Sequence, residues 1–360
     1  MKYKINKLSD TPIYLQLYEQ IRGDIIEKRI IYGEKLPSKR LVSEELGISV
    51  ISVEHAYSLL YDEGYINSKE RSGYFVAYSE TSGFQNPVKL PVLPHRRFEV
   101  SHNDFPFSVF AKTMRKVISE YGEGILQKSD NSGCNEFKEA IKDYLMRSRG
   151  IEINKDRIVI GSGAEYLYGI IIQMLGRDRI YATENPSYEK IEAVYRANGI
   201  KYELLDFGED GIKSEALVNT NADVLHITPY RSFPSGVTAD VSKRYEYLRW
   251  AGKNKYIIEE DFESEFSVLS KPAETVFSMS KDDNVIYLNT FSKTISPAVR
   301  IGYMVLPQKL VSVFKEKVGF YSCSVPTFEQ LVIADFISSG NFERHINRIR
   351  RKKRRNIVKN

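Results

Sequence analysis

Residues 36–65, LPSKRLVSEELGISVISVEHAYSLLYDEGY, decide the fold of the first part of this chain. Pro37 and Ser38 favour the start of a helix, and Gly47 favours its end. A further helix is predicted to begin near Ser49, after a turn of only about three to four residues. Its predicted inward face consists of Val53, Ala56, Tyr57, Leu60 and Tyr61. Two helices joined by so short a turn predict a helix-turn-helix.

The segments on both sides extend this motif. Before it, residues 11–30 predict a helix that Thr11 caps. The apolar stripe of this helix consists of Ile13, Leu17, Ile21 and Ile25. After the motif, YINSKERSGYFVAY at residues 65–78 alternates around a glycine-containing turn and predicts a β-hairpin. The order predicts an α+β winged helix-turn-helix over residues 1–78, whose third helix enters the major groove of double-stranded DNA. The alternative is a small packing module with no nucleic-acid role.

Composition limits the class of protein. A length of 360 residues predicts two units, and no apolar run approaches the roughly 18 residues that a membrane span requires. The N-terminus lacks the apolar segment of a secretory signal, so a cytoplasmic protein without a membrane partner is expected. Two cysteines and five histidines without ligand spacing predict no metal site.

Net charge alone does not predict DNA binding. The chain carries +5, but residues 1–78 hold eleven basic and eleven acidic side chains. The positive excess lies in residues 344–360, which hold nine basic and no acidic residues. We interpret this run as a solvated helix face, with a nucleic-acid tail as the alternative. The DNA-binding prediction therefore depends on pattern.

A second unit is predicted over residues 98–360, after a linker of Ser, Gly and Pro residues at 79–97. Short apolar segments alternate with helical stretches in this unit, which predicts an α/β fold with a mostly parallel sheet. The predicted strands are residues 157–160, 179–182, 223–227, 255–260, 285–289 and 301–306. Ligands in such sheets bind beyond the carboxyl ends of the strands.

Three segments at predicted strand ends carry candidate chemistry. GSGAE at 161–165 lets a phosphate approach the backbone at a helix start, although a helix start without a ligand is the alternative. EEDFESEF at 259–266 offers a carboxylate to a cationic ring nitrogen, or is a solvated acidic loop. NTFSKTISPAVRIGY at 289–303 sets a lysine, suited to a Schiff base, seven residues before an arginine suited to a phosphate. Together the segments predict an aldehyde phosphate, pyridoxal 5′-phosphate.

With these segments, the chain resembles the MocR subfamily of GntR-type regulators, in which a GntR winged helix-turn-helix is fused to a domain with the fold of type I aminotransferases. The resemblance covers nearly the whole chain. It is carried by residues 36–77 in the first unit and, in the second, by GSGAE, ENPSYEK, TPYRSFPSG, EEDFESEF and NTFSKTISPAVRIGYMVLP. It implies a type I aminotransferase-like second domain, and this chain is expected to stop before the small C-terminal subdomain of that fold.

The resemblance also implies site residues. Lys293 matches the lysine that forms the Schiff base with the cofactor, and Arg300 matches the arginine near its phosphate. The other implied cofactor-binding positions are Gly163, Ala164, Tyr188, Glu260, Asp261, Thr290 and Ser292. The expected DNA-binding positions are Ser38, Lys39, Arg40, Ser49, Ser52, Arg71, Ser72 and Gly73.

Several positions of the second unit depart from the family pattern. Glu260 stands where the family has the aspartate that faces the pyridine nitrogen, and Phe262 replaces a tyrosine. Lys128 replaces a tyrosine that reaches the cofactor phosphate across the subunit interface. Arg231 and Ser232 replace a His-Gln pair.

These observations predict a cytoplasmic transcriptional regulator that binds operator DNA as a homodimer. Pyridoxal phosphate would be its sensing group, responding to a small amino compound or to the cofactor itself. Residues 49–52 lack the family's groove-facing arginine, so weak non-specific DNA affinity with a shallow salt dependence is expected. Enzymatic turnover is not expected. The alternatives are an aminotransferase with a DNA-binding appendage and a regulator whose effector domain has lost the cofactor.

Overall fold

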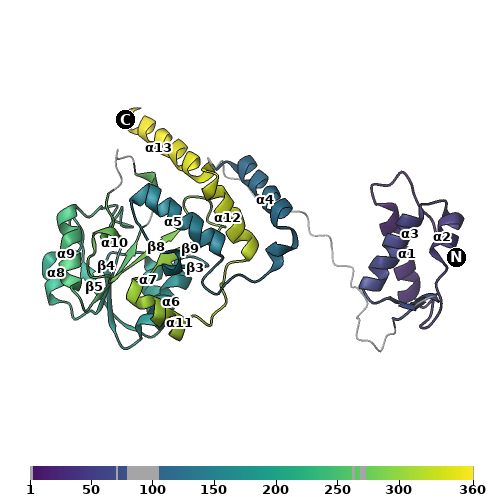
Figure 1. The fold of residues 1–360 in the computed structure, drawn as a ribbon, viewed down its shortest axis with the longest axis horizontal. Coiled ribbons are helices and arrows are strands. Elements are labelled where there is room, and N and C mark those ends of the chain that lie inside the picture. Colours follow the sequence, from purple (N-terminus) through teal and green to yellow (C-terminus); the bar gives the residue numbers. More distant parts are fainter. Residues whose placement is uncertain (1–2, 70–71, 79–104, 262–263, 268–272, 360) are drawn as a thin grey trace. The chain divides into compact units, whose positions relative to one another are not determined.

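The computed structural model describes residues 3–69, 72–78, 105–261, 264–267 and 273–359. The chain divides into two compact units, Met1–Glu99 and Val100–Asn360 (Figure 1). The predicted linker at 79–97, the wing residue Arg71 and Phe262 all lie outside the described residues. The exact domain boundaries therefore stay a prediction.

The first unit, called the head below, is a winged helix-turn-helix, as predicted. Its elements are α1 (Ile13–Ile26), α2 (Lys39–Leu46), α3 (Val50–Asp62), β1 (Ile66–Lys69) and β2 (Gly73–Val76). The two strands pair antiparallel and form the wing. Gly47 ends α2 in the left-handed conformation, with φ 59°, which glycine adopts without steric cost and which turns the chain into α3.

Two details of the head differ from the sequence prediction. The N-cap of α1 is Pro12, without a side-chain hydrogen bond, so Thr11 does not cap this helix. Tyr61 is 47% exposed and does not belong to the inward face of α3. The other predicted inward residues are buried, and the Tyr57 hydroxyl donates a hydrogen bond of 2.9 Å to the Pro37 carbonyl. Core burial therefore fixes α3 against the start of α2.

The second unit, called the large unit below, is built on one sheet of seven strands. The strands are β3 (Ile158–Gly161), β4 (Ile180–Asn185), β5 (Lys201–Asp206), β6 (Val224–Ile227), β7 (Tyr256–Glu260), β8 (Val285–Thr290) and β9 (Gly302–Val305). Their order is β3-β9-β8-β7-β6-β4-β5. Among these seven strands, β9 alone runs in the direction opposite to the others, so the predicted mostly parallel sheet is confirmed. The sequence prediction missed β5, an edge strand with polar, partly exposed residues.

Helices cover both faces of the sheet (Figure 1). One face packs against α6 (Ala164–Leu175), α7 (Glu189–Ala197) and α11 (Gln308–Lys317). The other face packs against α5 (Asn135–Arg149), α9 (Val241–Ala251), α10 (Val276–Met279) and α12 (Thr327–Ser338). Three further α-helices of the described residues are α4 (Phe107–Tyr121), α8 (Ser214–Asn219) and α13 (Asn341–Lys359).

Strand alternation divides the acidic end of β7 between these two faces. Ile258 lies in the core beneath α6, and Glu260 points to the same side and contacts α6. Ile257 lies in the core on the opposite face, which is also the side of Glu259 and Asp261.

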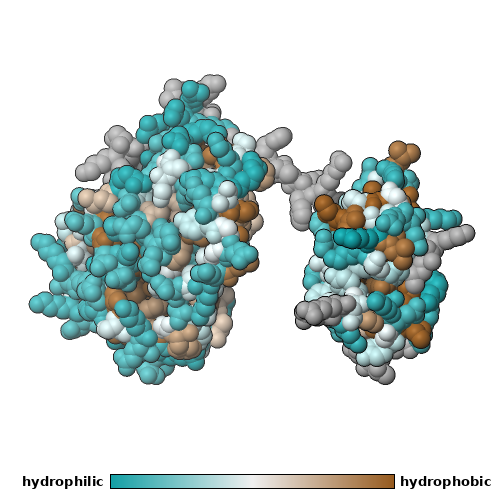
Figure 2. Space-filling model, turned by 45° about the vertical axis from the view of Figure 1, so that its right-hand side comes forward, coloured by the Kyte–Doolittle hydropathy of each residue, from teal (hydrophilic) through white to brown (hydrophobic). Residues whose placement is uncertain are grey.

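The visible surface of each unit is mostly hydrophilic, as expected when apolar side chains pack mainly in the core (Figure 2). The visible faces of both units carry mostly hydrophilic side chains, with separate apolar patches between them (Figure 2). Within the described part of the chain, no helix is both long and apolar enough to cross a membrane.

Candidate functional site

The starts of α2 and α3 form the candidate DNA-reading surface of the head. Ser38 caps α2 by accepting a hydrogen bond from the Leu41 backbone N–H at 3.2 Å. Ser49 caps α3 in the same way, accepting from the Ser52 N–H at 3.0 Å. These serines orient the helix ends, whose remaining N–H groups suit phosphate oxygens.

The two basic residues predicted on α2 differ in their surroundings. The Lys39 ammonium lies 2.6 Å from a carboxylate oxygen of Glu54 on α3, and this hydrogen bond raises the pKa of Lys39. Arg40 is exposed beside it. Because exposed ion pairs contribute little, a DNA phosphate can compete with Glu54 for Lys39.

The exposed start of α3 is apolar rather than basic. Val50 is 42% and Ile51 is 64% exposed, at the positions where the sequence prediction noted a missing arginine. Ser52 is half-buried and its hydroxyl lies 2.9 Å from that of Ser49. Branched apolar side chains in a major groove suit the methyl group of thymine.

The wing carries Ser72 and Gly73, both exposed, with Gly73 at φ 104°. Sequence reasoning missed two lysines that lie at the wing, Lys35 and Lys69. Lys35 and Lys69 both extend over the ring of Phe75, with their ammonium groups 6.0 and 4.8 Å from its centre. The isolated bridge between Lys35 and Phe75, which only the folded chain reveals, brings Lys35 there.

One pocket of the large unit opens where the strands end. It has a volume of about 330 Å³ and combines groups at or beyond the carboxyl ends of β3, β4, β6, β7 and β8. Its lining is Ala164, Glu165, Tyr188, Lys190, Thr228, Phe233, Glu260, Thr290, Ser292, Lys293, Pro297 and Arg300. Seven of the nine predicted cofactor-binding residues are therefore among those that line one cavity.

Gly163, the eighth predicted residue, forms the floor of an anion cradle at the start of α6. Gly163 is the N-cap of α6 and makes no side-chain cap. Its φ of 100° lies in the left-handed region that favours glycine, and the helix begins directly after it. A Cβ atom at this position would lie 2.9 Å from the Arg300 guanidinium. The helix N-terminus and the arginine thus face the same small space, which suits a phosphate group.

Acidic Glu165 also lies in this cradle, which sequence reasoning did not anticipate. Its carboxylate accepts hydrogen bonds from Arg300 at 2.6 Å and from Lys190 at 2.8 Å. Burial would raise the pKa of Glu165, but these hydrogen bonds and one from its own backbone N–H lower it to about 2. Lys190 follows Tyr188 by two residues in ENPSYEK, so the segment identified from sequence contained it.

Sheet register places the lysine loop beside the cradle. Gly302 on β9 pairs with Gly161 on one side and with Thr290 on the other. A Cβ atom at Gly302 would lie 3.1 Å from the Thr290 methyl group and 3.2 Å from the Asn289 carbonyl oxygen, so glycine permits this close approach. Lys293, three residues beyond β8, is exposed to the pocket that it lines.

Glu260 supplies a second carboxylate to the pocket. It is 6% exposed and accepts a 2.6 Å hydrogen bond from the Tyr168 hydroxyl of α6. His226 Nε2 lies 3.7 Å from the same carboxylate oxygen, and its other ring nitrogen lies 2.8 Å from the Tyr195 hydroxyl. These neighbours hold Glu260 toward the cavity, where it can face a cationic ring nitrogen.

Asp261 does not line the pocket, which corrects its predicted role. Its carboxylate forms an ion pair with Arg149 of α5 and accepts a 2.6 Å hydrogen bond from Tyr287. The reason is strand alternation, which turns Asp261 to the face opposite Glu260. There Arg149 also donates to Ser264, and the network belongs to the buried support of the sheet.

Two of the family departures also lie outside this cavity's lining. Lys128 is exposed on the segment between α4 and α5. Ser232 is fully buried and donates a 2.5 Å hydrogen bond to Glu184, whose carboxylate also accepts from the Thr228 N–H at 2.9 Å. Burial raises the pKa of Glu184 to about 8.

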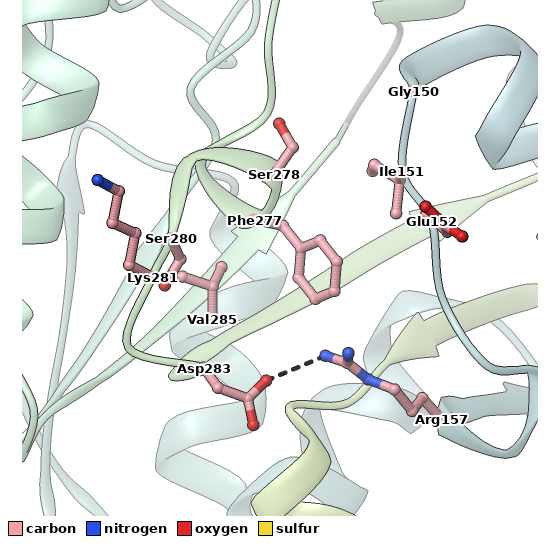
Figure 3. Close-up of a pocket in the computed structure, with 10 residues that line it drawn as sticks. All are labelled: Gly150, Ile151, Glu152, Arg157, Phe277, Ser278, Ser280, Lys281, Asp283 and Val285. Atoms are coloured by element: carbon pink, nitrogen blue, oxygen red, sulfur yellow. Dashed lines mark hydrogen bonds and ion pairs between the residues drawn. The ribbon is translucent and has the colours of Figure 1, made fainter.

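A second cavity, of about 250 Å³, lies near the starts of β3 and β8 (Figure 3). Arg157 faces Asp283 there at 3.1 Å, and its guanidinium lies 5.4 Å from the Phe277 ring centre. The Lys281 amine points away from this ion pair (Figure 3). The charges of Arg157 and Asp283 neutralise one another, and this cavity lies at the amino ends of the strands, so we assign the cavity no chemistry.

Comparison with known families matches both units. Residues 13–76 match the family described as bacterial regulatory proteins, gntR family. Residues 98–360 match the family described as aminotransferase class I and II.

Similar proteins extend over nearly the whole chain. The HTH-type transcriptional regulator YdeL of Bacillus subtilis is 31% identical, over 98% of this chain and 80% of its own length. The probable rhizopine catabolism regulatory protein MocR of Rhizobium meliloti is 27% identical, over 96% of this chain and 76% of its own. The pyridoxine biosynthesis regulator PdxR of Corynebacterium glutamicum is 27% identical, over 98% and 80%.

Solved structures match the large unit. A kynurenine aminotransferase of Pyrococcus horikoshii, in complex with PMP, superposes with a TM-score of 0.63 and 25% identity over 70% of this chain and 66% of its own. An archaeal alanine:glyoxylate aminotransferase superposes with a TM-score of 0.62 and 21% identity over 67% and 62%. This chain thus spans slightly less than two thirds of either aminotransferase, and the second likeness shows the fold alone.

Proposed function

The chain belongs to the MocR subfamily of GntR-type transcriptional regulators, and we propose that it binds operator DNA as a homodimer in the cytoplasm and holds pyridoxal phosphate as a sensing group. The head is its DNA-binding part. We propose domain limits of 1–78 for the head, 79–97 for the linker and 98–360 for the sensor.

One observation carries the cofactor proposal. Lys293 and Arg300, from the loop between β8 and β9, and Glu260, from the end of β7, line a single cavity. They match the three parts of pyridoxal phosphate, because an amine holds the aldehyde, a guanidinium holds the phosphate and a carboxylate faces the ring nitrogen. Tyr188 lines the same cavity and offers a ring for stacking.

Sensing would use the aldehyde that the cofactor supplies, to which amines add reversibly. A small amino compound would compete with the Lys293 amine for that aldehyde. The ligand can shift the DNA-binding equilibrium only through different affinities for two states of the dimer. The small amino compound and the dimer are parts of this proposal.

Reductive trapping tests the cofactor proposal. The full chain is loaded with pyridoxal phosphate, treated with borohydride, digested and analysed by mass spectrometry. A stable adduct on Lys293 is expected, and it should be lost in Lys293→Ala. Lys281→Ala is the matched control, because Lys281 is exposed at the other cavity, and it should keep the adduct. No adduct, or one at another lysine, would contradict the proposal.

The same protein separates the rival functions. Incubated with amino and keto acids, the loaded regulator should not release new products. Sustained transamination would instead favour an aminotransferase with a DNA-binding head. Failure to bind pyridoxal phosphate at all would favour a regulator with a cofactor-free effector unit.

A further inference from the structure

The anion cradle at the start of α6 contains a carboxylate of this chain. Glu165 accepts hydrogen bonds from Arg300 Nη2 at 2.6 Å and from Lys190 Nζ at 2.8 Å, on different carboxylate oxygens. One side chain therefore uses both of the cationic donors that a phosphate group would need here.

The location of the Glu165 carboxylate, as well as its hydrogen bonds, places it in the cradle. The Cβ position built on Gly163 lies 2.9 Å from Arg300 Nη2 and 3.5 Å from Glu165 Oε2. Both groups thus lie over the glycine that starts the helix. The Glu165 side chain is only 23% exposed, so its contacts are partly shielded from water.

We propose that Glu165 is an internal counter-anion of the phosphate cradle, and that a phosphate-bearing ligand binds by displacing its carboxylate from Arg300 and Lys190. This inference is based on the proposed cofactor function and deepens it. A phosphate and a carboxylate that share these donors would be like charges in contact, so one must leave. Glu165 then sets affinity for the phosphate end of the ligand and not for its ring.

The exchange has a use in a sensor. While Glu165 holds Arg300 and Lys190, the two cations stay in place, so cofactor entry does not need to order them. The energy of the displaced contacts is subtracted from the affinity for pyridoxal phosphate. A weakly held cofactor can respond to its own concentration.

Equilibrium titrations of the full chain test this inference. Wild type and Glu165→Gln are titrated with pyridoxal phosphate and with pyridoxal, which has the same ring and aldehyde but no phosphate. We expect Glu165→Gln to bind pyridoxal phosphate about tenfold more tightly and pyridoxal with unchanged affinity. The inhibition constant of inorganic phosphate, measured by its competition with pyridoxal phosphate, should also be lower in this variant.

A matched control is Glu192→Gln on α7, where Glu192 is ion-paired with Arg196 at 3.8 Å and does not line the pocket. It should leave both affinities unchanged. Circular dichroism of each variant checks the fold. Glu165→Asp, which keeps the charge, should stay close to wild type.

Three results would overturn the inference. Weaker binding of pyridoxal phosphate by Glu165→Gln would mean that Glu165 orients Arg300 beside the phosphate. Equal binding would mean that it plays no part. Absence of borohydride-trapped cofactor in wild type and variant alike would overturn the proposed function together with this inference, so the two failures are distinguishable.

Discussion

The head and the large unit present their functional side chains in opposite ways. The candidate DNA-reading surface of the head comes from one continuous segment, whose caps Ser38 and Ser49 are exposed. The pocket of the large unit collects groups from five strand ends, and Glu260 in it is buried. Surface recognition can be encoded locally, whereas a chemical pocket depends on the whole sheet. The four predictions below test this contrast.

The largest effect is expected from breaking the buried ion pair between Arg149 and Asp261. Their side chains are only 7% and 0% exposed, so Arg149→Met would leave an unpaired buried carboxylate. We expect a loss of about 3–5 kcal/mol in the free energy of unfolding of the large unit. Chemical denaturation followed by fluorescence measures it, and the head's own transition should not move.

Arg147→Met is the control for this pair. Arg147 is 50% exposed and pairs with Glu343 at 2.7 Å. Removing an exposed pair should cost less than about 1 kcal/mol. Equal losses for the two variants would refute the claim that burial makes the Arg149 network important.

The next effect is a pH dependence from Glu184. Burial raises its pKa from 4.5 in the unfolded chain to about 8. Its contribution to stability is therefore complete below about pH 4.5 and is lost as the pH rises through about 8. Glu184→Gln cannot ionise at this position, so its unfolding free energy should fall less than that of wild type across this window. The two decreases should differ by more than about 1 kcal/mol.

The comparison of wild type with Glu184→Gln is needed because burial also raises the pKa of Glu259 and of Glu265 to about 7. Urea unfolding at several pH values across the window supplies both curves. Parallel curves would show that Glu184 ionises normally in the folded chain.

A smaller effect is expected in the head. Ser49→Ala removes the hydroxyl that caps α3 and should lower the head's unfolding free energy by about 1 kcal/mol. The control Ser58→Ala, at an exposed position within α3, should have little effect. If both substitutions cost the same, the local capping argument for the head would be wrong.

The smallest stability effect should come from Glu54→Gln, which frees Lys39 at the candidate DNA-reading surface. Head stability should change by less than about 0.5 kcal/mol. DNA affinity should rise, and the salt dependence should steepen by about one phosphate contact. Glu44→Gln, an exposed acid on α2, controls for net charge and should raise affinity less.

The contrast also explains what the sequence could predict. Caps, periodicity and a glycine turn are local, so the helix boundaries around Gly47 and the wing followed from neighbouring residues. Strand positions and motif order likewise predicted most of the pocket. Tyr61 was misjudged because it follows the buried Tyr57 by four residues, which predicts the same helix face. In the structure Tyr61 nevertheless points outward and is 47% exposed.

The failures in the large unit have a different origin. Asp261 was grouped with Glu260 because they are neighbours in sequence, yet alternation along β7 puts them on opposite faces. Glu165 was overlooked because its partners, Lys190 and Arg300, lie 25 and 135 residues away along the chain. Such pairs form only when the sheet brings its ends together.

The central claim is that cofactor held in the large unit controls DNA binding by the head. Fluorescence anisotropy of labelled upstream intergenic DNA, titrated with the full chain with and without pyridoxal phosphate, tests it most directly. We predict that pyridoxal phosphate shifts the affinity of wild type and leaves that of Lys293→Ala unchanged. Coincident isotherms for wild type with and without the cofactor would contradict the account.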